Sequence, residues 1–232
     1  MSTMEMSSIQ NAKCEKQNVF LNHEGQGTLN GVKQSIQMWL TSEHLEIITR
    51  RINEDAALVR LMKDNPGKLY IAGGLPVCSL IGAPIGDINI FGTDRLLLME
   101  AARTYGLYSP CHMMEPTKYA VSVNGRIGRV QFELKEVYQS AWECIDSFDF
   151  SVCQAAIWFE YGKWQTVCSA KFYSDLNARK LRFINQERDD ESPVVSLWRA
   201  AKYTERGFTL SRSDKLALLD RCFQNYRRKN VK

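Results

Sequence analysis

The chain has 232 residues, of which 44% are hydrophobic and 24% charged, and its formal net charge at pH 7 is +4. These values exclude an intrinsically disordered or fibrous protein and allow one globular domain with a small appendage. A charge of +4 does not by itself indicate a nucleic-acid-binding protein. The basic residues gather in the C-terminal tail, residues 227–232, which could contact phosphate or could be solvated.

The cysteines and apolar runs indicate the cellular compartment. Seven scattered cysteines without a C-x-x-C pair are typical of reduced thiols, not of disulfides or a zinc site. The apolar runs are too short to cross a bilayer, and the N-terminus lacks the pattern of a secretion signal. We therefore expect a cytoplasmic protein in a reducing compartment, without membrane association.

The first third of the chain has a polar segment followed by a segment with regularly spaced apolar residues. Residues 1–35 are rich in Ser, Asn, Gln and Gly, which predicts an N-terminal arm that is disordered or ordered by a partner. From Thr41 or Ser42, apolar residues at helical spacing predict one long amphipathic helix that ends at residues 65–67. The apolar run 69–72 then predicts a buried strand, which leads directly into a glycine pair.

Turn and capping residues divide the remainder of the chain. A loop rich in proline and glycine is expected after the glycine pair, and Asn-Gly between alternating apolar segments predicts a hairpin. In chain order, we expect a strand at 87–91, a helix from a Thr93 cap to Gly106, a hairpin of 119–123 and 129–134, a helix at 138–145, a strand at 150–159, and helices opened by Ser192-Pro193 and by Ser211.

This order of elements predicts an α+β fold, with a small mixed sheet flanked by helices and a helical C-terminal part. We expect three segments along the chain. They are the N-terminal arm (1–35), a core (36–168) and a mostly helical C-terminal extension (169–232).

The glycine pair Gly73-Gly74 is the first candidate for chemistry. Because glycine has no Cβ, backbone N–H groups there can approach a ligand closely and cradle a phosphate group. A glycine pair after a strand also forms ordinary tight turns. On the residues alone both interpretations stay open.

The strand that follows supplies oxygen ligands. Alternate side chains of a strand share a face, so Asp87 and Asn89 project together while Ile88 and Ile90 point into the core. Two oxygen ligands at this spacing could hold a Mg²⁺ ion that also binds a triphosphate. The alternative is a half-buried strand with a polar outer face.

These motifs resemble a known family. The segments 70–74 and 86–91 look like the nucleotidyltransferase superfamily, which includes beta-type DNA polymerases, poly(A) polymerases and CCA-adding enzymes. Its pattern is a Gly-Gly or Gly-Ser turn followed by Asp-x-Asp, with a third carboxylate on a later strand. The resemblance covers roughly residues 68–160 and implies the fold of that superfamily.

The resemblance also implies a mechanism, in which two metal ions held by three carboxylates bind the triphosphate and activate an acceptor hydroxyl. Asp87 would be the principal ligand of Mg²⁺ or Mn²⁺. This sequence departs from the pattern, because the second carboxylate is the amide Asn89 and the third position is Gln131. Glu133 shares the face of Gln131 and is the candidate to substitute for it as catalytic residue and metal ligand, with Asp149 as a more distant candidate.

Five residues are predicted to contact the nucleotide. Lys202 and Arg206 lie four apart on one face of a helix and could reach phosphate, although a solvated helix surface would have the same pattern. The remaining three belong to the glycine turn and the loop after it: Gly73, Gly74 and Ser79.

Two functional hypotheses follow. The first is a nucleotidyltransferase that binds a nucleoside triphosphate and a divalent metal and transfers a nucleoside monophosphate to an unknown acceptor. The second is a catalytically degenerate subunit of the same fold that acts in binding or assembly. It would engage protein or nucleic acid through the N-terminal arm and the basic C-terminal tail. Losing two of three negative ligands weakens the hold on a pair of divalent ions, which favours the second hypothesis, whereas the intact glycine pair and Asp87 favour the first. Both stay open, and nucleotide binding is common to both.

Overall fold

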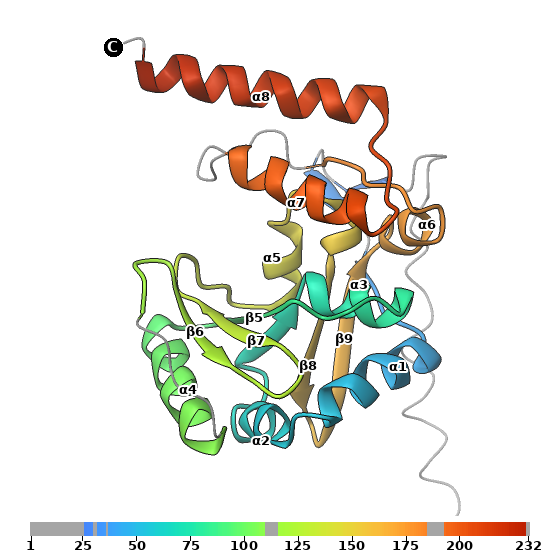
Figure 1. The fold of residues 1–232 in the computed structure, drawn as a ribbon. Helices are drawn as coiled ribbons and strands as arrows, with labels where there is room; N and C mark the ends of the chain where they lie inside the picture. The colour runs from blue at the N-terminus through green and yellow to red at the C-terminus, as the bar shows by residue number, and fades with distance from the viewer. Residues whose placement is uncertain (1–25, 30–31, 36, 110–115, 185–192, 231–232) are drawn as a thin grey trace, which may run out of the picture. The chain divides into compact units, whose positions relative to one another are not determined.

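A computed structural model describes residues 26–29, 32–35, 37–109, 116–184 and 193–230 (Figure 1). It divides into two compact units, residues 1–36 and 37–232. In the first unit, β1 (Gln26–Leu29) and β2 (Val32–Ser35) pair as an antiparallel hairpin, which the polar composition did not indicate. The rest of the predicted arm, the predicted Ser192 cap and the last two residues of the basic tail lie outside the described residues.

The second unit is built on a seven-stranded mixed sheet, which confirms the predicted α+β fold class. The strand order is β3-β9-β8-β4-β5-β7-β6, and only β5 and β7 run parallel. The strands are β3 (Gln37–Met38), β4 (Leu69–Ala72), β5 (Asp87–Gly92), β6 (Ala120–Asn124), β7 (Arg129–Glu133), β8 (Ala155–Glu160) and β9 (Lys163–Ser169).

Helices cover both faces of this sheet. The larger core lies between the sheet and helices α1 to α4 and extends to buried residues of α6, α7 and α8, and a smaller cluster lies between the other face and α5. Helices α7 and α8 are stacked beyond the sheet on the side of α5 (Figure 1). The helices are α1 (Ser42–Asn53), α2 (Ala56–Asp64), α3 (Gly74–Ile81), α4 (Arg95–Tyr108), α5 (Ala141–Asp146), α6 (Phe172–Asn177), α7 (Pro193–Glu205) and α8 (Arg212–Asn230), with a 3₁₀ turn at Ser151–Cys153.

Strand alternation sets up the site. All four residues of the central strand β4 are buried, and β5 alternates between half-buried and buried positions. Ile88 and Ile90 enter the larger core, whereas Asp87, Asn89 and Phe91 take the opposite face, as predicted. The predicted hairpin is also confirmed as β6 and β7, which pair Asn124 with Arg129.

Four predictions about the elements were wrong. The helix predicted from a Thr93 cap to Gly106 is capped by Asp94 and continues to Tyr108. The long first helix is two helices, because α1 ends with Glu54 as its C-cap and Asp55 caps α2 by accepting the Leu58 N–H at 3.0 Å. The expected loop after the glycine pair is helix α3. Pro76 lies in its first turn, where no backbone N–H donor is needed, so it does not break the helix. The strand predicted at 150–159 begins with the 3₁₀ turn, and β9 was not predicted.

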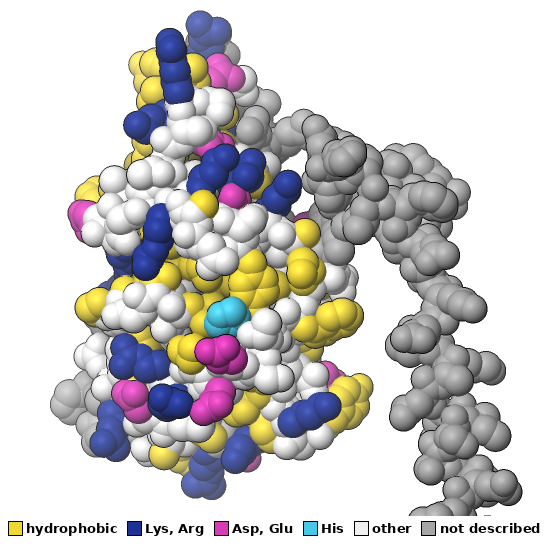
Figure 2. Space-filling model, turned by 90° about the vertical axis from the view of Figure 1, so that its right-hand side faces the viewer, with side chains coloured by type: hydrophobic (Ala, Val, Ile, Leu, Met, Phe, Trp, Pro, Cys, Tyr) yellow, Lys and Arg dark blue, Asp and Glu magenta, His cyan; other side chains and the backbone are white. Residues whose placement is uncertain are grey.

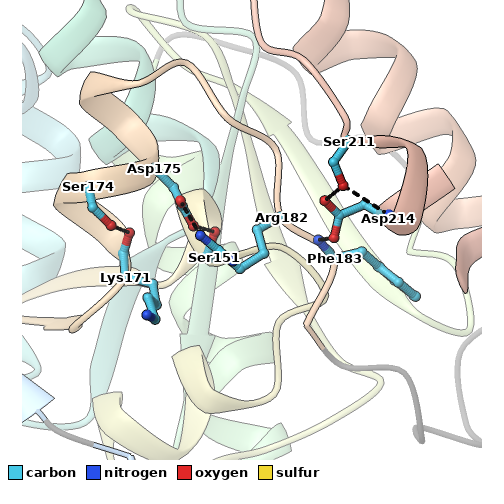
Figure 3. Close-up of polar contacts among 8 residues, drawn as sticks. All are labelled: Ser151, Lys171, Ser174, Asp175, Arg182, Phe183, Ser211 and Asp214. Atoms are coloured by element: carbon cyan, nitrogen blue, oxygen red, sulfur yellow. Dashed lines mark hydrogen bonds and ion pairs between the residues drawn. The ribbon is translucent and has the colours of Figure 1, made fainter. Parts of the chain in front are cut away.

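Two buried carboxylates accept hydrogen bonds from the segment that follows α6 (Figure 3). Asp175 accepts hydrogen bonds from the Ser151 hydroxyl at 2.7 Å and from Arg182 Nε and Nη2 at 2.8 and 3.0 Å. Asp214, in the first turn of α8, accepts from the Phe183 N–H at 3.1 Å. These contacts fix the path of the chain from the sheet to the C-terminal helices.

None of the helices in the described part of the chain is both long and apolar enough to span a membrane.

Candidate functional site

A cavity of about 200 Å³ lies where the glycine turn and β5 face α7. Its walls come from segments far apart in sequence. The lining residues are Gly73, Gly74, Cys78, Gly86, Asp87, Asn89, Phe91, Glu133, Lys135, Glu136, Tyr138, Ser147, Phe148, Asp149, Cys153, Arg199, Lys202, Tyr203 and Arg206.

Most of the predicted site residues line this cavity. Two do not. Gln131 is half-buried on β7 directly opposite Asn89, with which it pairs in register. Ser79 is buried in α3, and its hydroxyl oxygen has no hydrogen-bond partner among the described residues. The sequence placed Ser79 in a loop; as a helical residue it faces the interior.

The glycine turn has a backbone that only glycine adopts readily. Gly73 has φ 80° and ψ −110°, and its N–H donates to the carbonyl oxygen of Ala155 at 3.2 Å. Helix α3 begins at the next residue, and no side chain caps its N-terminus. Backbone N–H groups without a capping side chain, together with the helix dipole, favour an anion at this end of the cavity.

Two cations hold the carboxylate of Asp87. Arg129, which pairs with Asp87 across the parallel strands, places Nη2 at 2.7 Å and Nε at 2.9 Å from Oδ1. Lys202 Nζ on α7 lies 3.6 Å from Oδ2. The Asp87 side chain is 27% exposed, so solvent screens these pairs only in part.

The other two predicted metal ligands, Asn89 and Glu133, also lie at the cavity. Asn89 Oδ1 is buried and has no hydrogen-bond partner among the described residues, and Glu133 lines the same cavity. Within the described ranges, no group of three or more His, Cys, Asp or Glu side chains is arranged to hold a metal ion.

Helix α7 closes the cavity with a row of cations and one buried phenol. Arg199 pairs with the buried carboxylate of Asp149, and the Cys153 thiol donates to the Tyr203 hydroxyl at 3.4 Å. Arg206 lies over the Tyr203 ring, 5.5 Å from its centroid. The sequence prediction missed Arg199, although it stands three residues before Lys202 and therefore on the same face.

Burial keeps the thiols and phenols of the cavity neutral. It raises the pKa of the Cys153 thiol to about 12, and the neighbouring Asp149 carboxylate adds to this shift. Burial also raises the pKa of Cys78, against the opposing effect of Arg206, and the pKa values of Tyr138 and Tyr203. Neither thiol is therefore an activated nucleophile at neutral pH.

An aromatic wall stands on the β5 side of the cavity. The ring of Phe91 lies 6.0 Å from that of Tyr138 and 5.5 Å from that of Phe148, measured between centroids. Phe148 is also the nearest side chain to Gly73, where an added Cβ would lie 3.6 Å from the ring. The cavity thus combines a cluster of aromatic rings, inclined to one another by 51° to 64°, with cations and a helix N-terminus.

Solved structures with a similar fold are CCA-adding enzymes. The Thermotoga maritima enzyme complexed with tRNA matches with a TM-score of 0.59 and 16% identity, covering 85% of this chain and 48% of that one. A CCA-adding enzyme with CTP gives the same values, and an apo form gives a TM-score of 0.60 and 18% identity over 84% of this chain and 48% of that one. The second unit therefore has a nucleotidyltransferase-like fold, and the chain spans about half the length of these enzymes.

Sequence comparison identifies the family. Gabija anti-defense 2 from Bacillus phage SPbetaL7 is 25% identical over 168 residues, which are 71% of this chain and 39% of that protein. The sequence profile of the Gabija anti-defense 2 family matches residues 32–179, which include the glycine turn, β5, β7 and Asp149. The chain belongs to the Gabija anti-defense 2 family.

Proposed function

We propose that this protein acts against Gabija defense as a nucleotide-binding protein, and that its cavity holds nucleoside triphosphate through protein cations without metal-dependent transfer. The observation that carries the proposal is the pairing of Arg129 and Lys202 with Asp87. The role in anti-defense rests on the family to which the chain belongs.

The ligand set does not fit a pair of divalent ions. Asn89 and Gln131 are neutral, and Arg129 neutralises the remaining carboxylate, Asp87. A divalent ion about 4 Å from the Arg129 guanidinium would be repelled by on the order of 8 kcal/mol at an effective dielectric constant of about 20, unless Arg129 moved away. Because three carboxylates normally offset that charge, we propose that this set is degenerate.

The same groups suit the phosphate groups of a nucleotide. Lys202 on α7 and Arg206, the residue directly after α7, both line the cavity, and Arg206 Nη2 lies 3.9 Å from the position of a Cβ added at Gly86. The N-terminus of α3 lies at the same cavity and favours negative charge. The aromatic wall supplies a surface on which a base could stack.

The first test measures thermal stabilisation by each nucleoside triphosphate in EDTA and in Mg²⁺. A ligand at a hundred times its dissociation constant adds about 2.7 kcal/mol to the free energy of unfolding, and we expect the same shift with and without metal. Replacing both Lys202 and Arg206 by Ala should weaken binding by at least about 100-fold, since each charge-assisted bond contributes about 1.5–3 kcal/mol. The matched control replaces Lys215 and Arg227, two α8 cations outside the cavity lining, and should bind normally.

Asp87→Asn separates a cation-based site from a metal site. If Asp87 only competes with phosphate for Lys202 and Arg129, removing its charge should strengthen triphosphate binding about threefold. A metal ligand would show the opposite, namely weaker binding that depends on Mg²⁺ or Mn²⁺. Isothermal titration of the parent protein and of Asp87→Asn with triphosphate, each in EDTA and in Mg²⁺ or Mn²⁺, distinguishes a cation-based site from a metal site.

The transfer hypothesis remains the second candidate, because Asp87 and Glu133 line the same cavity. Incubation with labelled triphosphates, Mg²⁺ or Mn²⁺ and a cell extract tests it. A labelled product that requires Asp87 would replace the proposal of a degenerate site with that of an active nucleotidyltransferase.

A further inference from the structure

Among the described residues, helix α8 packs one face against the protein and exposes a row of apolar side chains on the other. Its inner face carries Leu218 and Arg221, both buried, and the Arg221 guanidinium lies over the Phe183 ring at 6.0 Å. On the opposite side, Leu216, Leu219, Phe223 and Tyr226 form a row that we call the outer stripe, and these side chains are between 46% and 68% exposed. A solvated helix normally presents polar residues there.

The spacing of the outer stripe matches a helix-pairing seam. Its members follow one another at intervals of three, four and three residues, the a and d positions of a heptad repeat. Successive members therefore lie on one side of the helix over about three turns. Single exposed apolar side chains are ordinary, whereas a continuous row rimmed by charges marks an interaction surface.

The charges beside the outer stripe indicate the partner. The α8 sequence has six Lys and Arg against two Asp, and Asp214 is turned inward to the Phe183 N–H. In Figure 2, the end of the molecule where α8 lies shows hydrophobic side chains beside several Lys and Arg side chains. Beside the outer stripe Lys215 and Arg227 outnumber Asp220, so a second copy of α8 would add a net excess of positive charge, which disfavours a homodimer through this face.

We propose that the outer stripe is a docking surface for a partner protein that presents an amphipathic helix with an apolar seam and acidic flanks. Apolar side chains of that helix pack on Leu219 and Phe223, and its carboxylates pair with Lys215 and Arg227. This surface is separate from the cavity, so the docking proposal stands or falls independently of nucleotide binding. It places contact with a partner on α8, not on the predicted arm.

The test uses the full chain and synthetic helical peptides of about three heptads with Leu at positions a and d. One peptide has Glu at the flanking e and g positions and the other has Lys. Fluorescence anisotropy should show binding of the Glu peptide, weakening with salt, and at least tenfold weaker binding of the Lys peptide. Absence of binding, or equal binding of both peptides, would overturn the proposal.

Variants locate the binding to α8. Phe223→Glu should lower the affinity for the Glu peptide about tenfold or more, because truncating or charging a central apolar anchor removes most of its contribution. Arg227→Glu should weaken binding of the Glu peptide and strengthen binding of the Lys peptide. The matched control is Leu96→Glu, since Leu96 is similarly exposed but lies on α4, and it should bind as the parent protein does.

Two other results would contradict an acidic helical partner. A dimer in analytical ultracentrifugation that Phe223→Glu dissociates would assign the outer stripe to a second copy of the chain. Binding of an RNA oligonucleotide that Phe223→Glu abolishes, with no peptide binding, would assign it to nucleic acid. Circular dichroism of each variant checks that the fold is retained, as expected for substitutions at exposed positions.

Discussion

Replacing Asp55 by Ala is expected to lower the free energy of unfolding by about 3–5 kcal/mol, through the loss of two buried hydrogen bonds and one that is partly buried. Oδ1 accepts the Leu58 N–H at 3.0 Å, and Oδ2 accepts the Tyr105 hydroxyl at 2.6 Å and the Arg126 N–H at 3.1 Å. One buried side chain thus caps α2 and joins it to α4 and to the β6–β7 turn. Urea denaturation measures the change.

Asp94→Ala is the matched control for Asp55→Ala. Asp94 caps α4 in the same way, by accepting the Leu97 N–H at 2.9 Å, but it is exposed and makes no comparable buried contacts among the described residues. We expect Asp94→Ala to lower the free energy of unfolding by about 1 kcal/mol, the usual contribution of a capping side chain. If the two alanine variants lost the same stability, the network around Asp55 would have no effect beyond helix capping.

Gly73→Ala is expected to have the second-largest effect, a loss of about 3 kcal/mol, at the upper end of the cost of a strained backbone. Its φ of 80° and ψ of −110° lie outside the regions open to residues with a Cβ, so the loss comes from backbone strain, because the added atom would be only in ordinary contact with the Phe148 ring at 3.6 Å. Since the glycine turn lines the cavity, we also expect weaker stabilisation by nucleoside triphosphates. Denaturation and thermal shift measure the two effects.

Gly82→Ala separates conformational strain from the general cost of replacing glycine. Gly82 ends α3 with φ 68° and ψ 19°, and nothing lies within 4 Å of an added Cβ. Alanine tolerates this left-handed conformation at about 1 kcal/mol, so its stability loss should be about a third of that at Gly73. Equal losses at both sites would argue against a special backbone requirement at the glycine turn.

Strong local patterns were predicted correctly. The alternation along β5 and the Asn-Gly pair at Asn124 each predicted a local backbone geometry. Such geometry depends mainly on residues that are close together in the sequence. The break at Asp55 escaped prediction because the apolar period runs through it. Only Tyr105 and Arg126, distant in sequence, explain why an aspartate is buried there.

For the candidate site, the sequence by itself determined that Asp87 and Asn89 would share one face of a strand, because short-range spacing controls strand faces. The resemblance added the expectation that the amides Asn89 and Gln131 stand where carboxylates are usual. Only the tertiary structure decided the electrostatic state of the remaining one, because Arg129 and Lys202 reach Asp87 through the parallel pairing of β5 with β7 and through the packing of α7. Charge interactions depend on distance in space, and long-range strand pairing and helix packing set those distances.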